Sequence, residues 1–173
     1  SSMNYSSAVY QESGQSLEEA QVNKMNRICD RLQLGPDDHL LEIGTGWGGL
    51  AVHLAKRSGC RITTTTISAE QAALARQRIE SAGLSGSIEV LEVDYRDLTG
   101  TYDKLVSIEM IEAVGWKYFP TYFAKCSELL KPNGAMLLQS ITVVAEAFEN
   151  EKTSRNFTNS IIFPGGCLPS RAE

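Results

Sequence analysis

The sequence predicts an α/β protein built on a doubly wound, mainly parallel sheet. Short apolar runs alternate along the chain with segments of helical periodicity, which is the pattern of repeated βαβ crossovers. A glycine-rich turn follows the first predicted strand and opens the first crossover helix, which is where such sheets bind their ligands. Strands joined through helices in this way run parallel, with right-handed crossovers.

The first half of the chain predicts three helices and two strands. Ser16 and Glu19 have the spacing of a capping box at the start of the first helix, and a Gly-Pro pair stops that helix. Ser68 caps the third helix, with Gln71 at the matching box position. In order, we expect helix 16–34, strand 39–44, helix 50–57, strand 61–67 and a helix from the Ser68 cap to about residue 83.

The second half predicts three more strands and one helix before the pattern fades. These are strand 88–93, strand 104–108, helix 118–130 and strand 135–142. Residues 143–157 fit either a helix or a loop, and residues 161–170 have the composition of turns. Since an open sheet ending here would leave an unprotected edge, we expect a fragment of a longer domain. A homodimer is one hypothesis for how that edge is covered.

Composition excludes several classes of protein. The 173 residues suit one domain, and a net charge of −5 without a basic block argues against a nucleic-acid partner. No apolar run approaches the length of a membrane-spanning helix. The four cysteines form no Cys-x-x-Cys pair, so neither a metal site nor a disulfide framework is expected, and a reducing cytoplasm is the simplest compartment.

The turn after the first strand is the most informative segment. Its glycines, at positions 44, 46 and 48, allow the backbone to pass close to a ligand, and their spacing differs from that of the dinucleotide fingerprint. Glu42 just before them can reach a ligand's ammonium group, which favours S-adenosylmethionine. The alternatives are a merely tight structural turn and, for Glu42, a solvated charge at a strand end.

Two further strand ends carry candidate cofactor contacts. Gln71 follows the second strand and can donate to and accept from ribose hydroxyls, a role compatible with helix capping. Asp94 follows the third strand and can accept from an adenine amine, while Tyr95 can stack on the ring. The alternative for Tyr95 is a half-buried packing aromatic.

Six motifs together resemble one family, the cyclopropane-fatty-acyl-phospholipid and mycolic acid cyclopropane synthases. The match spans nearly the whole chain, and the motifs stand in the family's order. They are MNYS at 3–6, LEIGTGWGG at 41–49, TISAEQ at 66–71, DYRD at 94–97, IEAVG at 111–115 and FPGGCLPS at 163–170. The resemblance implies a Rossmann-like class I methyltransferase fold with seven strands, the last two beyond this chain.

The resemblance also implies a domain plan and a cofactor site. Residues 1–35 would cover the cofactor, residues 36–142 would form the S-adenosylmethionine-binding core, and residues 143–173 would begin the lipid-substrate region. The implied cofactor-binding residues are Tyr5, Ser6, Glu42, Gly44, Thr45, Gly46, Trp47, Gly48, Thr66, Ser68, Gln71, Asp94 and Tyr95.

In this family a bicarbonate ion acts as the base beside the reacting carbon. Glu112 resembles its glutamate ligand and Ile141 its backbone donor. Ser7 stands at the family's cysteine and Gln139 at its histidine, and neither adds positive charge, so the ring-closing outcome is open. The family's tyrosine would lie past this chain.

The leading hypothesis is a methyltransferase that adds a methyl or methylene group to the double bond of an unsaturated fatty-acyl phospholipid. It would touch the inner face of the membrane transiently from the cytoplasm. A methyltransferase for another small molecule is the second hypothesis. A catalytically impaired S-adenosylmethionine-binding protein is the third, and Ser7 and Gln139 are the residues that keep it open.

Overall fold

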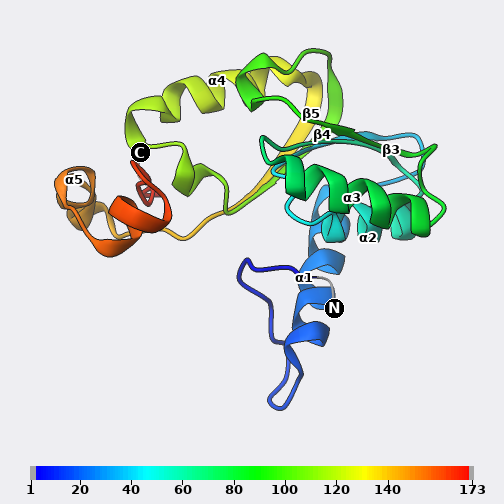
Figure 1. Cartoon of the computed structure of the whole chain (residues 1–173), viewed down its shortest axis with the longest axis horizontal. Helices are drawn as coiled ribbons and strands as arrows, with labels where there is room; N and C mark the ends of the chain where they lie inside the picture. Colours follow the sequence, from blue (N-terminus) through cyan, green and yellow to red (C-terminus); the bar gives the residue numbers. More distant parts are fainter. Residues whose placement is uncertain (1–2, 172–173) are drawn as a thin grey trace.

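The computed structural model describes residues 3–171 and confirms the predicted parallel sheet (Figure 1). Its five strands all pair in parallel, in the order β3-β2-β1-β4-β5. They are β1 (His39–Ile43), β2 (Arg61–Thr65), β3 (Ile88–Leu91), β4 (Tyr102–Ile108) and β5 (Leu130–Gln139). The order reverses between β1 and β4, so the carboxyl end of β1 lies at the switch point where open sheets of this kind bind ligands.

Helices cover both faces of the sheet. On one face lie α1 (Leu17–Leu32), α2 (Gly49–Ser58) and α3 (Ala69–Ser81), and on the other lies α4 (Phe119–Leu129) (Figure 1). Each face has its own buried cluster, one around Leu40 and Leu54 and one around Leu41 and Tyr122. The remaining helical elements are η1 (Tyr95–Asp97), η2 (Ile111–Ala113), η3 (Trp116–Tyr118), α5 (Ala145–Thr153) and η4 (Thr158–Ile162).

The helix caps follow the predicted chemistry in part. Ser16 and Glu19 form the complete capping box at α1, with the Ser16 side chain accepting from the Glu19 amide and the Glu19 carboxylate accepting in return. Ser68 accepts from the Gln71 amide at α3. The Gln71 side chain does not return to Ser68 but turns toward the end of β2, so only half of that box forms.

All five strands differ from the predicted ranges: β1 ends one residue earlier than expected, β4 begins two residues earlier, and the other three differ for one physical reason. A strand ends where its neighbour stops offering hydrogen bonds. The strands predicted over residues 61–67 and 88–93 end at Thr65 and Leu91, which pair with each other. The strand predicted over residues 135–142 ends at Gln139, opposite the last residue of β4, and it begins earlier because Leu130 pairs with Tyr102 across an irregularity.

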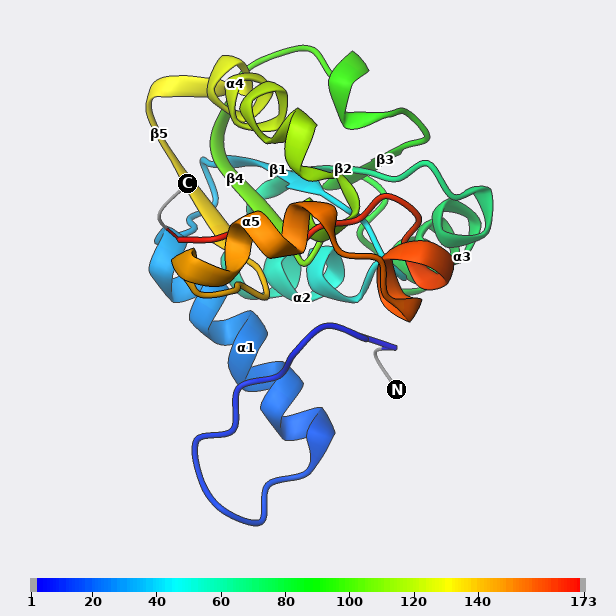
Figure 2. The same cartoon turned by 90° about the vertical axis from the view of Figure 1, so that its left-hand side faces the viewer.

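Residues 3–9, here called the N-terminal strap, fold back along α1 (Figure 2). The Val9 amide donates to the Ala20 carbonyl, and the Gln21 side chain donates to the Ser6 carbonyl at 2.7 Å. The strap thereby returns to the carboxyl rim of the sheet. The predicted outer segments also include residues 1–2 and 172–173, which lie outside the described residues.

Candidate active site

The turn between β1 and α2 bends as tightly as its glycines predict. Gly44, Gly46 and Gly48 have φ values of 103°, 50° and 81°, a region that side chains rarely adopt. The Gly44 and Thr45 amides both donate to the Thr65 carbonyl at the end of β2. A side chain at Gly48 would meet Ala75 Cβ at 2.9 Å, so this glycine lets α3 approach the turn.

Glu42 lies under this turn, in the core of the sheet. It is 2% exposed, and its Oε2 accepts from Thr64 Oγ1 at 2.5 Å. Thr64 Oγ1 also lies 2.7 Å from Thr45 Oγ1, so the two hydroxyls form a chain leading to the carboxyl group. Burial raises the pKa of Glu42 to about 8, against the opposing effect of the Thr64 hydrogen bond. Glu42 is therefore a buried acid that a cation could ionise, rather than a solvated charge.

The N-terminal strap lies over the turn. The Tyr5 ring faces Gly46, where a side chain would meet it at 3.8 Å. Gln71 Nε2 donates to the Tyr5 hydroxyl at 3.3 Å, and Thr66 Oγ1 donates to Gln71 Oε1 at 3.0 Å. A cleft remains between strap and turn, lined by Met3, Asn4, Tyr5, Ser6, Lys24, Glu42, Gly44, Thr45, Gly46, Trp47, Leu50 and Ile108.

Four of the other predicted cofactor contacts, Gly48, Ser68, Asp94 and Tyr95, do not line this cleft. Ser68 caps α3, and Gly48 serves the packing of α3. Asp94 caps η1 and pairs with Arg96 at 2.7 Å, and the hydrogen bond from Arg96 lowers the pKa of Asp94. Tyr95 packs edge-on against Tyr122, as in its packing interpretation. Neither Asp94 nor Tyr95 lines the cleft.

A second cluster of polar groups lies where β4 and β5 end. Glu112 Oε1 accepts from the Ile141 amide at 2.7 Å and from Ser140 Oγ at 3.0 Å. Its other oxygen, Oε2, is buried and has no hydrogen-bond partner among residues 3–171. The structure thus brings Glu112 and Ile141 into direct contact and leaves one carboxylate oxygen in need of a donor.

Ser7 and Gln139, the two positions that differ from the family's pattern, meet beside this cluster. Both bond to Glu109, a residue that the sequence analysis missed. Glu109 Oε1 accepts from the Ser7 amide at 2.9 Å and from Gln139 Nε2 at 2.9 Å. Gln139 Nε2 also donates to the Ser7 carbonyl at 3.2 Å. Glu109 has a φ of 51° and directly follows β4, so the rule that ligand-side residues follow strand ends was a signal for it.

Lys24 is the second missed residue. It lines the cleft from α1, is 3% exposed and donates from Nζ to Ser6 Oγ at 2.6 Å. The signal was its position four residues from both Ala20 and Ile28, on the face of the helix that the apolar pattern marks as buried.

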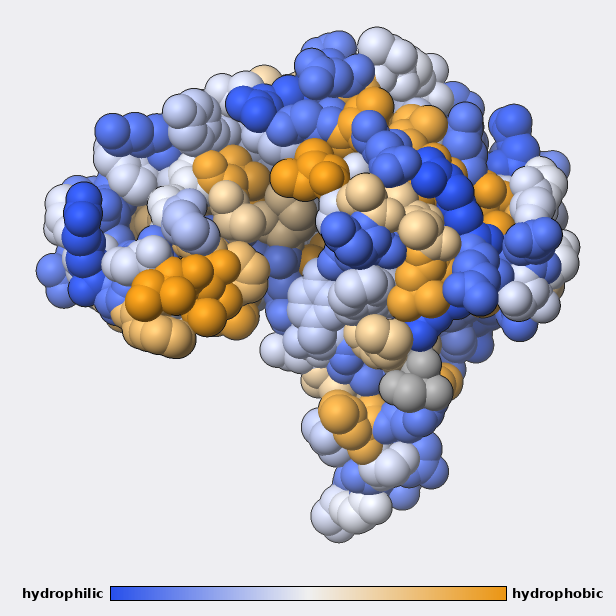
Figure 3. Space-filling model, viewed as in Figure 1, coloured by the Kyte–Doolittle hydropathy of each residue, from blue (hydrophilic) through white to orange (hydrophobic). Residues whose placement is uncertain are grey.

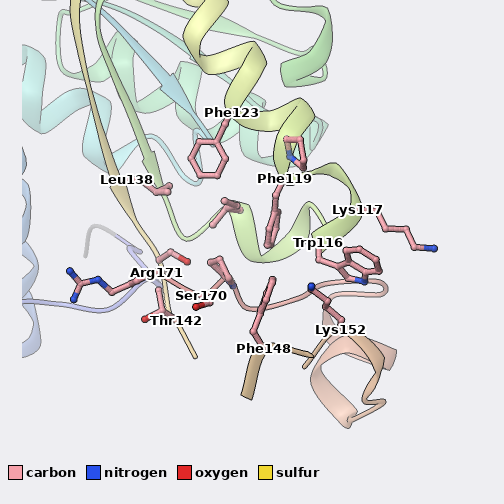
Figure 4. Close-up of a pocket in the computed structure, with 14 residues that line it drawn as sticks. Trp116, Lys117, Phe119, Phe123, Leu138, Thr142, Phe148, Lys152, Ser170 and Arg171 are labelled. Atoms are coloured by element: carbon pink, nitrogen blue, oxygen red, sulfur yellow. The ribbon is translucent and has the colours of Figure 1, made fainter. Parts of the chain in front are cut away.

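A larger cavity of about 780 Å³ opens between α4, β5 and α5 (Figure 4), and Ser140, which donates to Glu112, is among the residues that line it. Phe119, Phe123, Leu138 and Phe148 give it a mostly apolar wall. Lys152 lies at its margin, with Nζ 4.5 Å from the centre of the Phe148 ring. The cavity has the size and lining of a site for an apolar ligand.

Residues 3–171 contain no cluster of three or more histidine, cysteine, aspartate or glutamate side chains suited to a metal ion. Within the same range, none of the helices combines the length and apolar character that crossing a bilayer requires.

The parallel sheet, its switch-point turn and the acid beneath it define the class I S-adenosylmethionine-dependent methyltransferase fold. The family model described as mycolic acid cyclopropane synthetase matches residues 1–173. The chain belongs to this family.

Curated relatives agree with that assignment. The tuberculostearic acid methyltransferase of Mycobacterium tuberculosis is 43% identical over 151 residues, covering 87% of this chain and 35% of that protein. The cyclopropane-fatty-acyl-phospholipid synthase of Escherichia coli K12 is 43% identical over 171 residues, covering 97% of this chain and 42% of that protein. The chain thus spans about two fifths of the length of these relatives.

Solved structures show the same fold. The cyclopropane synthase MmaA2 of Mycobacterium tuberculosis superposes with a TM-score of 0.87 at 26% identity. The mycolic acid cyclopropane synthase CmaA1, complexed with SAH and CTAB, superposes with a TM-score of 0.88 at 28% identity. Each comparison covers 98% of this chain and 62% of the other.

Proposed function

We propose that the chain is the cofactor-binding part of a methyltransferase that adds a methyl or methylene group to the double bond of an unsaturated fatty-acyl phospholipid. Family membership supports the lipid substrate, since the matched relatives are named for fatty-acyl products. The observation that carries the cofactor assignment is the buried Glu42 beneath a strap-covered glycine turn.

The cleft suits S-adenosylmethionine group by group. That cofactor supplies an electrophilic methyl group on a sulfonium sulfur. Glu42 would receive its ammonium, because a cation compensates the cost of ionising a buried carboxyl group. Tyr5, Thr66 and Gln71 would surround the ribose, since their linked hydroxyl and amide groups offer donors and acceptors at one rim of the cleft.

Bicarbonate does not fit the second cluster as its donors are arranged. Both amide protons of Gln139 point to carbonyl or carboxylate oxygens, and the Ile141 amide serves Glu112. Glu109 and Glu112 add two carboxylates to the same region, which opposes binding of an anion. No step of the proposed reaction therefore passes through bicarbonate.

In the proposed reaction, Glu112 acts as the general base. Attack of the acyl double bond on the methyl group would form a carbon–carbon bond and break the methyl–sulfur bond, whose electron pair stays on the sulfur of the departing thioether. Positive charge would be left on a lipid carbon. Transfer of a proton from that lipid to Glu112 Oε2 releases a C–H electron pair, which closes a ring or forms a new double bond. The unpartnered Oε2 supports this role, because Oε1 is already held by Ser140 and Ile141.

The apolar cavity would hold the acyl chain. Phe119, Phe123 and Phe148 line it and would exclude water from the developing positive charge (Figure 4). Beside it, exposed apolar side chains form a patch over η4 (Figure 3), comprising Phe157, Ile161, Ile162 and Phe163. Such a patch suits transient contact with a membrane surface, from which the acyl chain of the lipid would enter the cavity.

The decisive experiment uses the full-length protein, methyl-labelled S-adenosylmethionine and vesicles of unsaturated phospholipid. Label in the acyl chains supports the proposal. Label only in an added small molecule would favour the second hypothesis, and cofactor binding without any transfer would favour an impaired binding protein.

The role of Glu112 is tested with Glu112→Gln in the same assay. Turnover should fall about 100-fold or more, the usual contribution of a general base, while cofactor affinity stays unchanged. The exposed Glu80 on α3 gives the matched control, since Glu80→Gln should retain wild-type turnover. Full turnover by Glu112→Gln would remove Glu112 as the base.

A further inference from the structure

The cofactor cleft contains a buried lysine for which the proposed function gives no role. Resting on that proposed function, we infer that Lys24 binds the carboxylate of the cofactor's amino-acid group, opposite the ammonium site at Glu42. The cleft would then recognise both charges of a zwitterion, and not only the nucleoside.

The position of Lys24 is costly without a ligand. Its side chain is 3% exposed, and burying an ammonium group is unfavourable unless it is paired. Burial lowers the pKa of Lys24, and the charge of Glu109 partly opposes this. Among the described residues its hydrogen-bond partner is Ser6 Oγ, a neutral hydroxyl, although an ammonium group has three protons to donate.

The geometry of the cleft supports an anionic ligand group at this position. Lys24 and Glu42 line the same cleft, together with the turn residues Gly44 and Thr45. Because burial keeps Glu42 protonated at neutral pH, the ligand-free cleft carries the charge of Lys24 uncompensated by Glu42. A carboxylate would compensate that charge, and the accompanying ammonium would ionise Glu42.

A purely structural role makes a different prediction. Lys24 also anchors the strap through Ser6, and the strap carries Tyr5 over Gly46. If anchoring were its whole role, loss of the lysine would weaken the binding of every nucleoside that lies beneath the strap. If Lys24 binds the carboxylate, its loss should weaken the binding only of ligands that have a carboxylate.

The test measures calorimetric affinity of the full-length protein for S-adenosylmethionine and for its decarboxylated form, which keeps the sulfonium and the amine. Lys24→Met should lower the affinity for S-adenosylmethionine about 10- to 100-fold, as expected for loss of a charge-assisted hydrogen bond. The affinity for the decarboxylated form should stay nearly unchanged. Lys24→Arg should restore most of the affinity. Lys56→Met, on the exposed face of α2, is the matched control and should bind both as the wild type does.

Equal weakening of both ligands by Lys24→Met would overturn the inference. Should that variant fail to fold, the wild-type protein still decides: it should prefer S-adenosylmethionine over the decarboxylated form by a similar factor, and equal affinity would refute the carboxylate contact. A wild-type protein that binds neither nucleoside would instead refute the proposed function.

Discussion

Cofactor binding should release a proton from Glu42, and this can be worked out from its burial. The free protein holds the carboxyl group at a pKa of about 8, so about nine tenths of it is protonated at pH 7. A bound ammonium group requires the ionised form. Apparent affinity should therefore rise about ninefold from pH 6 to pH 7 and level off above pH 8, because protons compete with the ligand.

The assay is titration calorimetry at pH 7 in buffers of different ionisation enthalpy. The slope of heat against ionisation enthalpy should give about 0.9 proton released per cofactor bound. Glu42→Gln should lose both this release and the pH dependence. Affinity that is independent of pH between 6 and 7, or net proton uptake, would refute the placement of the ammonium at Glu42.

Three further predictions concern stability. The pKa of Glu42 is higher in the folded protein than in the unfolded chain. Its contribution to the free energy of unfolding is therefore fully present below pH 4.5 and is lost as pH rises through 8. The free energy of unfolding of Glu42→Gln, measured with urea, should therefore rise relative to that of the wild type by on the order of 4 kcal/mol across that range. A difference that does not change with pH would contradict this. Gly48→Ala should cost about 3 kcal/mol through its contact with Ala75, whereas Gly83→Ala, at a similar φ with no atom nearby, should cost about 1 kcal/mol; equal costs in thermal unfolding would argue against the contact. Ser16→Ala should cost about 1 kcal/mol by loss of the α1 cap, and an unchanged unfolding midpoint would show the cap to be dispensable.

The fold was predictable because its signals are local. Alternating apolar runs and helical periodicity identified every strand and the first four helices, and Ser16 and Ser68 marked two helix starts correctly. Strand ends were less predictable, because they depend on where a neighbouring strand stops. Strands β2 and β3 end together at the paired residues Thr65 and Leu91 for that reason, and no local feature of either segment predicts those end points.

The candidate site was predictable where one segment carries it. The turn at residues 44–48 and Glu42 were identifiable because glycine spacing and a preceding acid are contiguous signals. Glu109 and Lys24 act through partners far along the chain, Ser7 and Ser6, which only the folded strap brings near. The burial of Glu42 was equally invisible, since it arises from the strands on both sides of β1.

The N-terminal strap has one more consequence, which concerns cooperativity. Within three consecutive residues it contacts Gly46 through Tyr5, Lys24 through Ser6, and Glu109 through Ser7. A single tether thus spans both ligand regions. Whatever ligand immobilises it at one end lowers the ordering entropy still to be lost at the other, and this coupling is reciprocal by thermodynamic necessity. Under the proposed function, nucleoside and lipid would therefore change each other's binding affinity by the same factor through the strap, in addition to their direct contact.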